Sequence, residues 1–237
     1  MGNSLEQTIK GDGNSQQSII NQYNNCNFNV TEAQIIDIIK KHSFVNRDQL
    51  VDEIKEAISS IEQEHMKEPD KRIFVPLIQQ LSYSLDDEYI KNTYKKLLQS
   101  SMNINKNPHP SFVNVISQLN SDEIKLLNCL EPSKPYPLID IKEEVNSKGF
   151  LFILLNFTDI VFGVCKYPEN VCSYIDNLER LKIIRISQLK IANREVYTKL
   201  EKHSSIQNIL VDYKNTGFVE KTMMLTQFGI DFLNCCR

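Results

Sequence analysis

The side chains that could bind a metal ion or carry out catalysis are few and scattered. Glu62 and His65 lie three residues apart, a spacing that puts both on one helix face and that di-iron helix bundles use. Such bundles need this pair twice, together with two more glutamates on facing helices. The sequence contains the pair once, so we interpret it as an exposed helix face and predict no metal site.

The acidic run Asp86–Asp87–Glu88 could also supply metal ligands. Carboxylates are common in the first turn of a helix, where they interact favourably with the helix dipole, and we favour this second interpretation. The chain has no H-E-x-x-H motif, no phosphate-binding loop and no G-x-S-x-G nucleophile motif. With only seven glycines it has no dinucleotide-binding fingerprint either. We therefore predict no catalytic residue, no cofactor and a protein that is not an enzyme.

The six cysteines form no C-x-x-C pair and follow no signal peptide. This usage is typical of the reducing cytoplasm, where most cysteines are structural thiols. We predict a cytoplasmic location and assign no site to these residues, which are Cys26, Cys129, Cys165, Cys172, Cys235 and Cys236.

The overall composition is that of a globular protein. Hydrophobic residues make up 41% of the chain and charged residues 24%, both ordinary values. The formal net charge of −3 provides no overall basic field that would attract nucleic acid or an anionic membrane. The most apolar segment, Phe150 to Cys165, is too short to span a membrane and contains Asn156 and Asp159. We expect it to form buried core, and we expect no membrane association.

The segment from Gly11 to Val30 is rich in amides, with nine Asn or Gln among its twenty residues. Near its end, apolar residues alternate with asparagines, the pattern of a half-buried strand. Amide side chains of stacked identical strands can bond to their own copies. We predict that this arm is a homo-oligomerisation element, while a flexible arm and a strand laid on the protein's own helices stay open as alternatives. The candidate residues are Asn21, Tyr23, Asn25, Asn27, Phe28 and Asn29.

Helical periodicity dominates the rest of the first half. Apolar residues recur every three or four positions, and Ser, Thr, Asp or Asn residues stand where helices would begin. We expect Pro69 to end the second helix and Pro76 to lie near the first turn of the third. The expected helices are 31–42, 47–66, 73–81, 86–100, 111–119 and 121–130.

The second half changes character after the proline-rich segment Pro132 to Pro137, which breaks the helical series. We predict a recognition-like helix that passes into a strand over 168–187, a helical segment over 196–213, a strand over 218–225 and a last helix capped by Thr226. This order fits a winged-helix domain. In that fold Leu178 and Leu181 would pack against Phe228 and Phe232.

Basic residues decide whether such a domain binds DNA. From Ser121 to Arg237 the chain has fifteen acidic and fifteen basic residues, whereas a duplex binder needs several cations on the phosphates. The balance weakens the DNA interpretation without removing it. Its candidate residues are Arg180, Lys182, Arg185, Lys190 and Arg194.

Residues Ile73 to Leu130 carry a further pattern, in FVPLIQQLSYSLDDEYIKNTYKKLLQSSM followed by HPSFVNVISQLNSDEIKLLNCL. An acidic helix start, an aromatic residue before a Leu-Leu pair, a serine-rich exit and a His-Pro-Ser-Phe-Val opening together resemble the Abi-alpha family of bacterial abortive-infection proteins. The aromatic position holds Tyr94 where that family usually has Trp. The resemblance implies a role in defence against phage, and it supplies no catalytic residue.

Together these features predict a mainly α protein in three parts. Residues 1–30 form an amide-rich β arm, residues 31–120 a helical Abi-alpha-like domain, and residues 121–237 a winged-helix-like α+β domain. We predict a defence protein that acts through oligomerisation or through sensing a protein partner. The alternative is a winged-helix transcriptional regulator that binds DNA.

Overall fold

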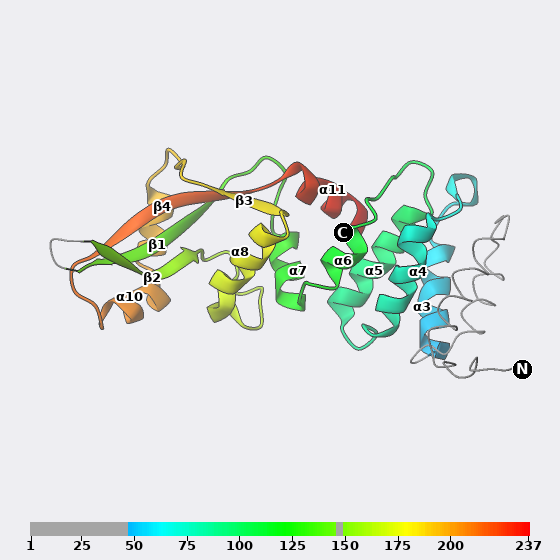
Figure 1. Ribbon diagram of the computed structural model, residues 1–237, viewed down its shortest axis with the longest axis horizontal. Helices are drawn as coiled ribbons and strands as arrows, with labels where there is room; N and C mark the ends of the chain where they lie inside the picture. Colours follow the sequence, from blue (N-terminus) through cyan, green and yellow to red (C-terminus); the bar gives the residue numbers. More distant parts are fainter. Residues whose placement is uncertain (1–46, 146–148) are drawn as a thin grey trace, which may run out of the picture.

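The structure of the chain is a computed structural model that describes residues 47–145 and 149–237. The molecule is elongated, with helices at one end and a sheet at the other (Figure 1). The last helix returns from the sheet to the helical end, so the C-terminus lies among the helices of the first half.

The helical end is arranged around one central helix, α5 (Glu88–Ser101), which contacts five other helices. Its buried residues Tyr94, Leu97 and Leu98 lie at the middle of the core, as the apolar spacing predicts. The helices that α5 contacts are α3 (Arg47–Ser59), α4 (Lys71–Ser82), α6 (Phe112–Ile116), α7 (Ser121–Asn128) and α11 (Gln227–Cys236).

Polar side chains fix where these helices begin. The Asp87 carboxylate accepts hydrogen bonds from the backbone N–H groups of Tyr89 and Ile90, both at 3.1 Å, so the acidic run is a helix start. Helix α7 begins at Ser121 as expected, and Asn120 and Glu123 form a capping box at its start. Thr226 caps α11 by accepting from the N–H of Gly229, as predicted.

The second expected helix is shorter than its sequence pattern. Helix α3 ends at Ser59, well before Pro69, and a short 3-10 turn, η1 (Gln63–His65), follows. The hydroxyls of Ser59 and Ser60 donate to carbonyl groups of the last turn, at 2.9 and 2.8 Å. Such local bonds compete with continued helix.

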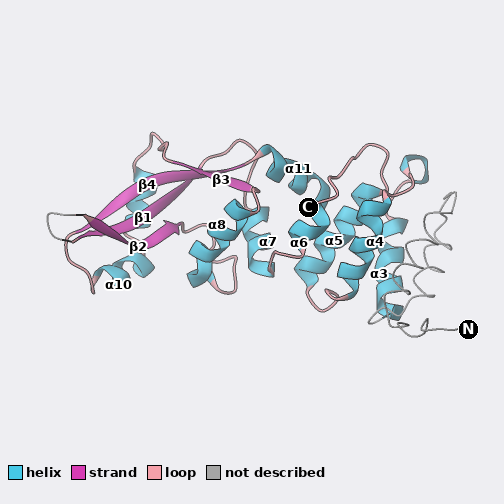
Figure 2. Cartoon of the chain, in the orientation of Figure 1, coloured by secondary structure: helices cyan, strands magenta, loops and turns pink. Residues whose placement is uncertain are grey.

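The other end is a four-stranded antiparallel sheet with strand order β2-β1-β4-β3 (Figure 2). Its strands are β1 (Tyr136–Glu144), β2 (Phe150–Phe157), β3 (Ile184–Ser187) and β4 (Thr216–Leu225). The remaining elements of this end are η3 (Pro168–Asn170), α8 (Val171–Arg180), α9 (Glu195–Glu201) and α10 (Ser204–Leu210).

Helices cover both faces of this sheet. Successive side chains of a strand point to opposite faces, so Glu220 and Lys221 of β4 mark the two sides. Lys221 belongs to a buried cluster that reaches Asp176 of α8, through Asn156. Glu220 pairs with Arg194, directly before α9. Helices α8 and α9 therefore lie on opposite faces, and the sheet is the middle layer.

The fold prediction holds in part, because the helices are present but the four-stranded sheet makes the chain a mixed α+β protein and not a mainly α one. The sequence pattern suggested only a break at Pro132–Pro137, but β1 begins at Tyr136. Pro137 is tolerated because β2 pairs with β1 only from Ile139 onward, so that at Pro137 the strand has one neighbour, β4. The winged-helix classification is not confirmed, since the β1–β2 hairpin forms half of the sheet and was not part of that pattern.

Other predictions for the second half have mixed outcomes. The strand over 218–225 is confirmed as β4, and the expected helix over 196–213 is two helices, α9 and α10. Leu178 is fully buried. Phe228 and Phe232 pack their rings against Phe112 of the helical end, with centroids 5.2 and 5.4 Å apart, and the expected contact of Leu178 and Leu181 with them stays a prediction.

Candidate interaction edge of the sheet

Strand β2 lies at one edge of the sheet and exposes large apolar side chains. Phe150, Leu151 and Phe152 are 54, 62 and 48% exposed, and Leu155 is 42% exposed. The expectation that 150–165 is buried core is therefore wrong for the start of this segment, whose burial rises only toward Asn156 and Phe157. Neighbouring exposed apolar residues of this size are typical of interaction surfaces.

The same stretch carries no charge. From Phe150 to Thr158 the sequence has no Lys, Arg, Asp, Glu or Pro. Natural edge strands normally carry such residues, because the unpaired N–H and C=O groups of an edge are a template for another strand. The edge formed by β2 lacks this protection.

Two apolar faces meet at this end of β2. Glu144, Glu143 and Lys142 pair in regular register with Phe150, Leu151 and Phe152. Phe150 and Phe152 therefore share one face, where their rings lie 5.3 Å apart, and Leu151 is on the other. The Lys142 ammonium lies 5.0 Å from the Phe150 ring centre, a cation–π contact that leaves the ring exposed.

A β-bulge shapes the inner end of β2. Ile139 pairs with Phe157 and Ile141 with Leu154, so β2 has one residue more than β1 between these pairs. Asn156 lies within this bulge and has a φ of 61°. This is a left-handed conformation that Asn tolerates better than most residues. Its backbone N–H donates to Asp140 Oδ1 at 2.8 Å.

A buried ion pair holds this bulge in place. Lys221 Nζ lies 2.6 Å from Asp140 Oδ1 and donates to Asn156 Oδ1 at 2.5 Å. Asn156 Nδ2 in turn donates to Asp176 Oδ1 of α8 at 2.8 Å. The side chains of Lys221 and Asp140 are only 7 and 5% exposed, so each charge depends on the other for compensation. Asp140, Asn156, Asp176 and Lys221 thus form a buried polar cluster that joins β1, β2, β4 and α8.

The opposite edge, β3, is protected. It has four residues, and Arg185 is exposed in it. The Ile186 N–H donates to Glu179 Oε1 of α8 at 3.2 Å, so a side chain occupies a backbone donor of this strand. Short length and an edge charge are common means of preventing strand addition.

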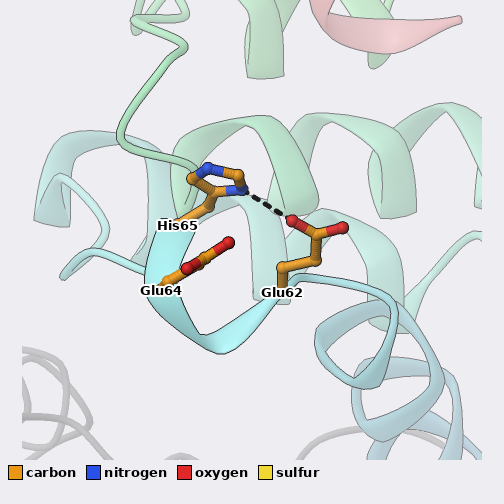
Figure 3. Close-up of side chains that lie close together, drawn as sticks. All are labelled: Glu62, Glu64 and His65. Atoms are coloured by element: carbon orange, nitrogen blue, oxygen red, sulfur yellow. Dashed lines mark ion pairs between the residues drawn. The ribbon is translucent and has the colours of Figure 1, made fainter.

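The residues considered as metal ligands lie near one another, although not on a regular helix. Glu62, Glu64 and His65 have ligand atoms within 4.8 Å of one another, on and just before η1 (Figure 3). Glu62 Oε2 and His65 Nδ1 form an ion-pair contact at 3.0 Å. Both glutamates are exposed, so solvent satisfies them without an ion. The glutamates are exposed as expected, but they lie at a 3-10 turn and not on a helix face, and the absence of a metal stays a prediction.

The five basic residues of the DNA alternative have different surroundings. Lys190 and Arg194 both pair with Glu220, at 3.0 and 2.8 Å. Arg180 donates to Asn177 and Gln118, while Lys182 follows α8 and Arg185 lies in β3. Two of the five thus share the Glu220 carboxylate, Arg194 also pairs with Glu201 at 3.2 Å, and binding of DNA stays a prediction.

The described cysteines are free thiols. Burial raises the pKa of Cys165 and of Cys172 to about 11 and raises those of Cys129, Cys235 and Cys236 as well. A thiol must ionise to act as a nucleophile or a metal ligand. Their environment therefore agrees with the structural role expected from the sequence.

The predicted oligomerisation arm lies outside the described residues. This holds for Asn21, Tyr23, Asn25, Asn27, Phe28 and Asn29, for Cys26 and for the helix expected over 31–42. Within the described ranges, no helix has the length and apolar character needed to cross a membrane.

Sequence reasoning missed the β2 edge, although one signal was available. The residues Asn146, Ser147, Lys148 and Gly149 separate two runs rich in apolar residues, which is a hairpin pattern. That pattern predicts paired strands. It does not show that one of them lies at an edge, because this depends on which strand pairs with β1 on its other side.

Comparison with known proteins yields a family match. The family model described as abortive infection alpha matches residues 30–236. A solved structure of an uncharacterized protein from the hydrocarbon-degrading marine bacterium Alcanivorax borkumensis SK2 is 15% identical, with a TM-score of 0.37, and the match covers 52% of this chain and 90% of that chain. A TM-score this low carries no argument about fold or function. No curated protein matches.

Proposed function

The chain belongs to the abortive infection alpha family, and on this premise we propose that it is an interaction protein of phage defence. Membership of the family suggests a role in abortive infection. In our proposal the protein carries out this role in the cytoplasm by oligomerising or by sensing a protein partner, and it performs no catalysis itself.

The exposed edge of β2 is the observation that carries this proposal. Phe150, Leu151 and Phe152 present apolar surface on both faces of a strand whose outer side has no partner strand among the described residues. A protein that binds another strand or sheet needs this combination, since main-chain hydrogen bonds supply affinity and side chains supply specificity.

Two further features support binding rather than chemistry. The charges of Lys221 and Asp140 are directed at each other inside the sheet domain, away from solvent. The described thiols have pKa values raised by burial, which disfavours the thiolate. Neither feature provides a group poised for catalysis.

The amide-rich arm is a second element of the proposal. Its candidate residues, Asn21 to Asn29, would add self-association through amide ladders between copies. Light scattering on the full chain and on a chain that begins at Thr31 tests this contribution. Weak self-association is detected at roughly tens of micromolar protein. Equal masses for both chains at that concentration would contradict a role of the arm in the resting protein.

A phage challenge tests the proposed function itself. Bacteria that produce the wild-type chain, Leu151→Lys or Leu189→Lys would be infected with a panel of phages and the efficiency of plating measured. Leu189 is 77% exposed and follows β3, so it provides the same substitution away from β2. We expect Leu151→Lys to lose protection and Leu189→Lys to retain it. Full protection by Leu151→Lys would contradict the proposal.

A further inference from the structure

We propose that the occupant of the β2 edge is β2 of a second copy of this chain. The two strands pair antiparallel about a two-fold axis at Leu151 and join two four-stranded sheets into one continuous sheet. This inference rests on the proposed function, because it names the partner of the surface that carries that function.

The first step concerns the kind of occupant. Within the described residues β2 pairs with β1 alone, so its outer backbone groups face away from the sheet. These groups alternate in donor and acceptor direction along the strand, and an added strand matches this pattern. The hairpin of β1 and β2 lies at the end of the molecule away from the helical half (Figure 1).

The second step concerns the chemistry of that strand. Phe150 and Phe152 are exposed on one face and Leu151 on the other, so the added strand must be apolar on both faces along this stretch. The arm of this chain is apolar on one parity only, with asparagines at positions 25, 27 and 29 on the other. Strand β2 is apolar on both. It therefore matches a copy of itself better than it matches the arm.

The third step concerns register. An axis at Leu151 places Phe150 of each copy opposite Phe152 of the other and the two Leu151 side chains opposite each other. Directly opposed side chains have Cβ atoms about 4.5–5.5 Å apart, and aromatic pairs of this kind stabilise a sheet. The three most exposed residues of the strand are covered at once, and no charge of β2 opposes another because Phe150 to Thr158 has none.

The other edge explains why the pairing stops at two copies. Strand β3 is short, contains exposed Arg185, and has Glu179 bound to the Ile186 N–H. A dimer through β2 leaves only the two protected β3 edges at the ends of the joined sheet. The two-fold contact is thus closed, as is usual for stable homo-oligomers.

Light scattering on the full chain tests the inference. We expect Leu151→Lys to have half the mass of the wild type and of Leu189→Lys, because two lysines would face each other across the axis, while any association through the amide-rich arm is common to the three proteins. A monomeric wild type, or a Leu151→Lys protein with the mass of the wild type, would overturn the inference. Both substituted leucines are exposed, and circular dichroism would confirm that each variant is folded.

Disulfide cross-linking tests the register. Leu151→Cys should form a covalent dimer on mild oxidation, with the 151–151 link identified by mass spectrometry, whereas Arg185→Cys on the β3 edge should not. A dimer that lacks this link contradicts an axis at Leu151.

Failure of the inference can be told apart from failure of the proposed function. If the wild type is monomeric while Leu151→Lys loses phage protection, β2 serves a different partner and only the inference fails. If Leu151→Lys is monomeric and still protects, the dimer exists and the proposed function fails.

Discussion

The two edges of the sheet belong to the same four strands and differ in almost every respect that controls strand addition. Strand β2 has eight residues with an uncharged, apolar outer end, whereas β3 has four residues, one exposed charge and a side-chain partner for one N–H group. Both edges contact α8. The difference therefore arises from local sequence and not from the layer on which they rest.

We interpret this difference to mean that β2 is an edge available for pairing with another strand. At β3, the exposed Arg185 and the hydrogen bond from the Ile186 N–H to Glu179 disfavour the addition of another strand. The same means are missing from Phe150 to Thr158, while a buried ion pair stabilises the inner end of that strand. The buried Lys221–Asp140 pair holds the inner end of β2 in one conformation. A strand that is rigid before it meets its partner binds with a smaller loss of conformational entropy.

The largest expected effect on stability comes from the buried polar cluster that contains Lys221 and Asp140. Lys221→Ala leaves the Asp140 carboxylate buried without its cation, and we expect the free energy of unfolding to fall by about 3–5 kcal/mol. Urea denaturation measures this loss. The matched change on the β3 side is Lys190→Ala, because the Lys190 side chain is 60% exposed and a surface pair of this kind contributes about 0–1 kcal/mol. Similar losses for both variants would break the comparison.

A glycine beside the β3 edge, Gly229 of α11, and a glycine in the central strand β4, Gly217, provide the second comparison. A Cβ at Gly229 would lie 2.1 Å from the carbonyl oxygen of Ile183, directly before β3, whereas a Cβ at Gly217 would meet only the flexible Lys142 side chain at 3.4 Å. We expect Gly229→Ala to lower the free energy of unfolding by about 3 kcal/mol, since backbone must move. Gly217→Ala should leave the thermal midpoint nearly unchanged. A harmless Gly229→Ala would contradict the packing of α11 beside β3.

The segment that leaves β2 depends on pH through Asp122 of α7. Burial raises the pKa of this carboxyl, but the N–H groups of Lys166 and Tyr167 and the ammonium of Lys125 outweigh burial and lower the pKa to about 2. A carboxyl whose pKa is lowered by folding stabilises the protein above its unfolded pKa, near 4, and loses this contribution as the pH falls toward 2.

We expect wild type to exceed Asp122→Asn by about 2 kcal/mol in free energy of unfolding at pH 7. The difference should shrink steadily below pH 4. Denaturation curves of both proteins between pH 2 and pH 7, the range set by these values, measure it. A constant difference across that range would show that the carboxylate charge does not hold this segment.

The smallest expected effect concerns the protection of β3. Glu179→Ala removes the acceptor of the Ile186 N–H, and we expect a loss of about 1 kcal/mol in free energy of unfolding. Glu179→Gln keeps an acceptor oxygen and should lose less. If Glu179→Ala matches wild type in urea, the carboxylate is not what closes this edge.

Much of the helical end could be predicted from the sequence, because its signals are local. The Asp87 cap, the Thr226 cap and the apolar spacing that buries Tyr94 and Leu97 each depend on residues within one or two turns. The sheet was harder. Strand β2 shows no alternation, since its outer end is apolar on both faces and a bulge at Asn156 shifts the register at its inner end.

The candidate site was missed for a related reason. Whether Phe150 is core or surface depends on β4 taking the other side of β1, a contact between segments about 80 residues apart in the paired register. The residues proposed for oligomerisation from the sequence, Asn21 to Asn29, lie outside the described residues and remain a prediction. Their amide pattern and the β2 edge are separate proposals for the same property, self-association.

Hydrogen exchange of the two edges at several protein concentrations tests the central claim most directly. If β2 pairs with a second copy about Leu151, the outward-facing backbone amides of Phe150 and Phe152 exchange slowly at high concentration and faster on dilution, because dissociation exposes them. Residues 184–187 should exchange at the same rate throughout. Exchange of the Phe150 and Phe152 amides that does not change with concentration, at a monomeric mass, would contradict the account.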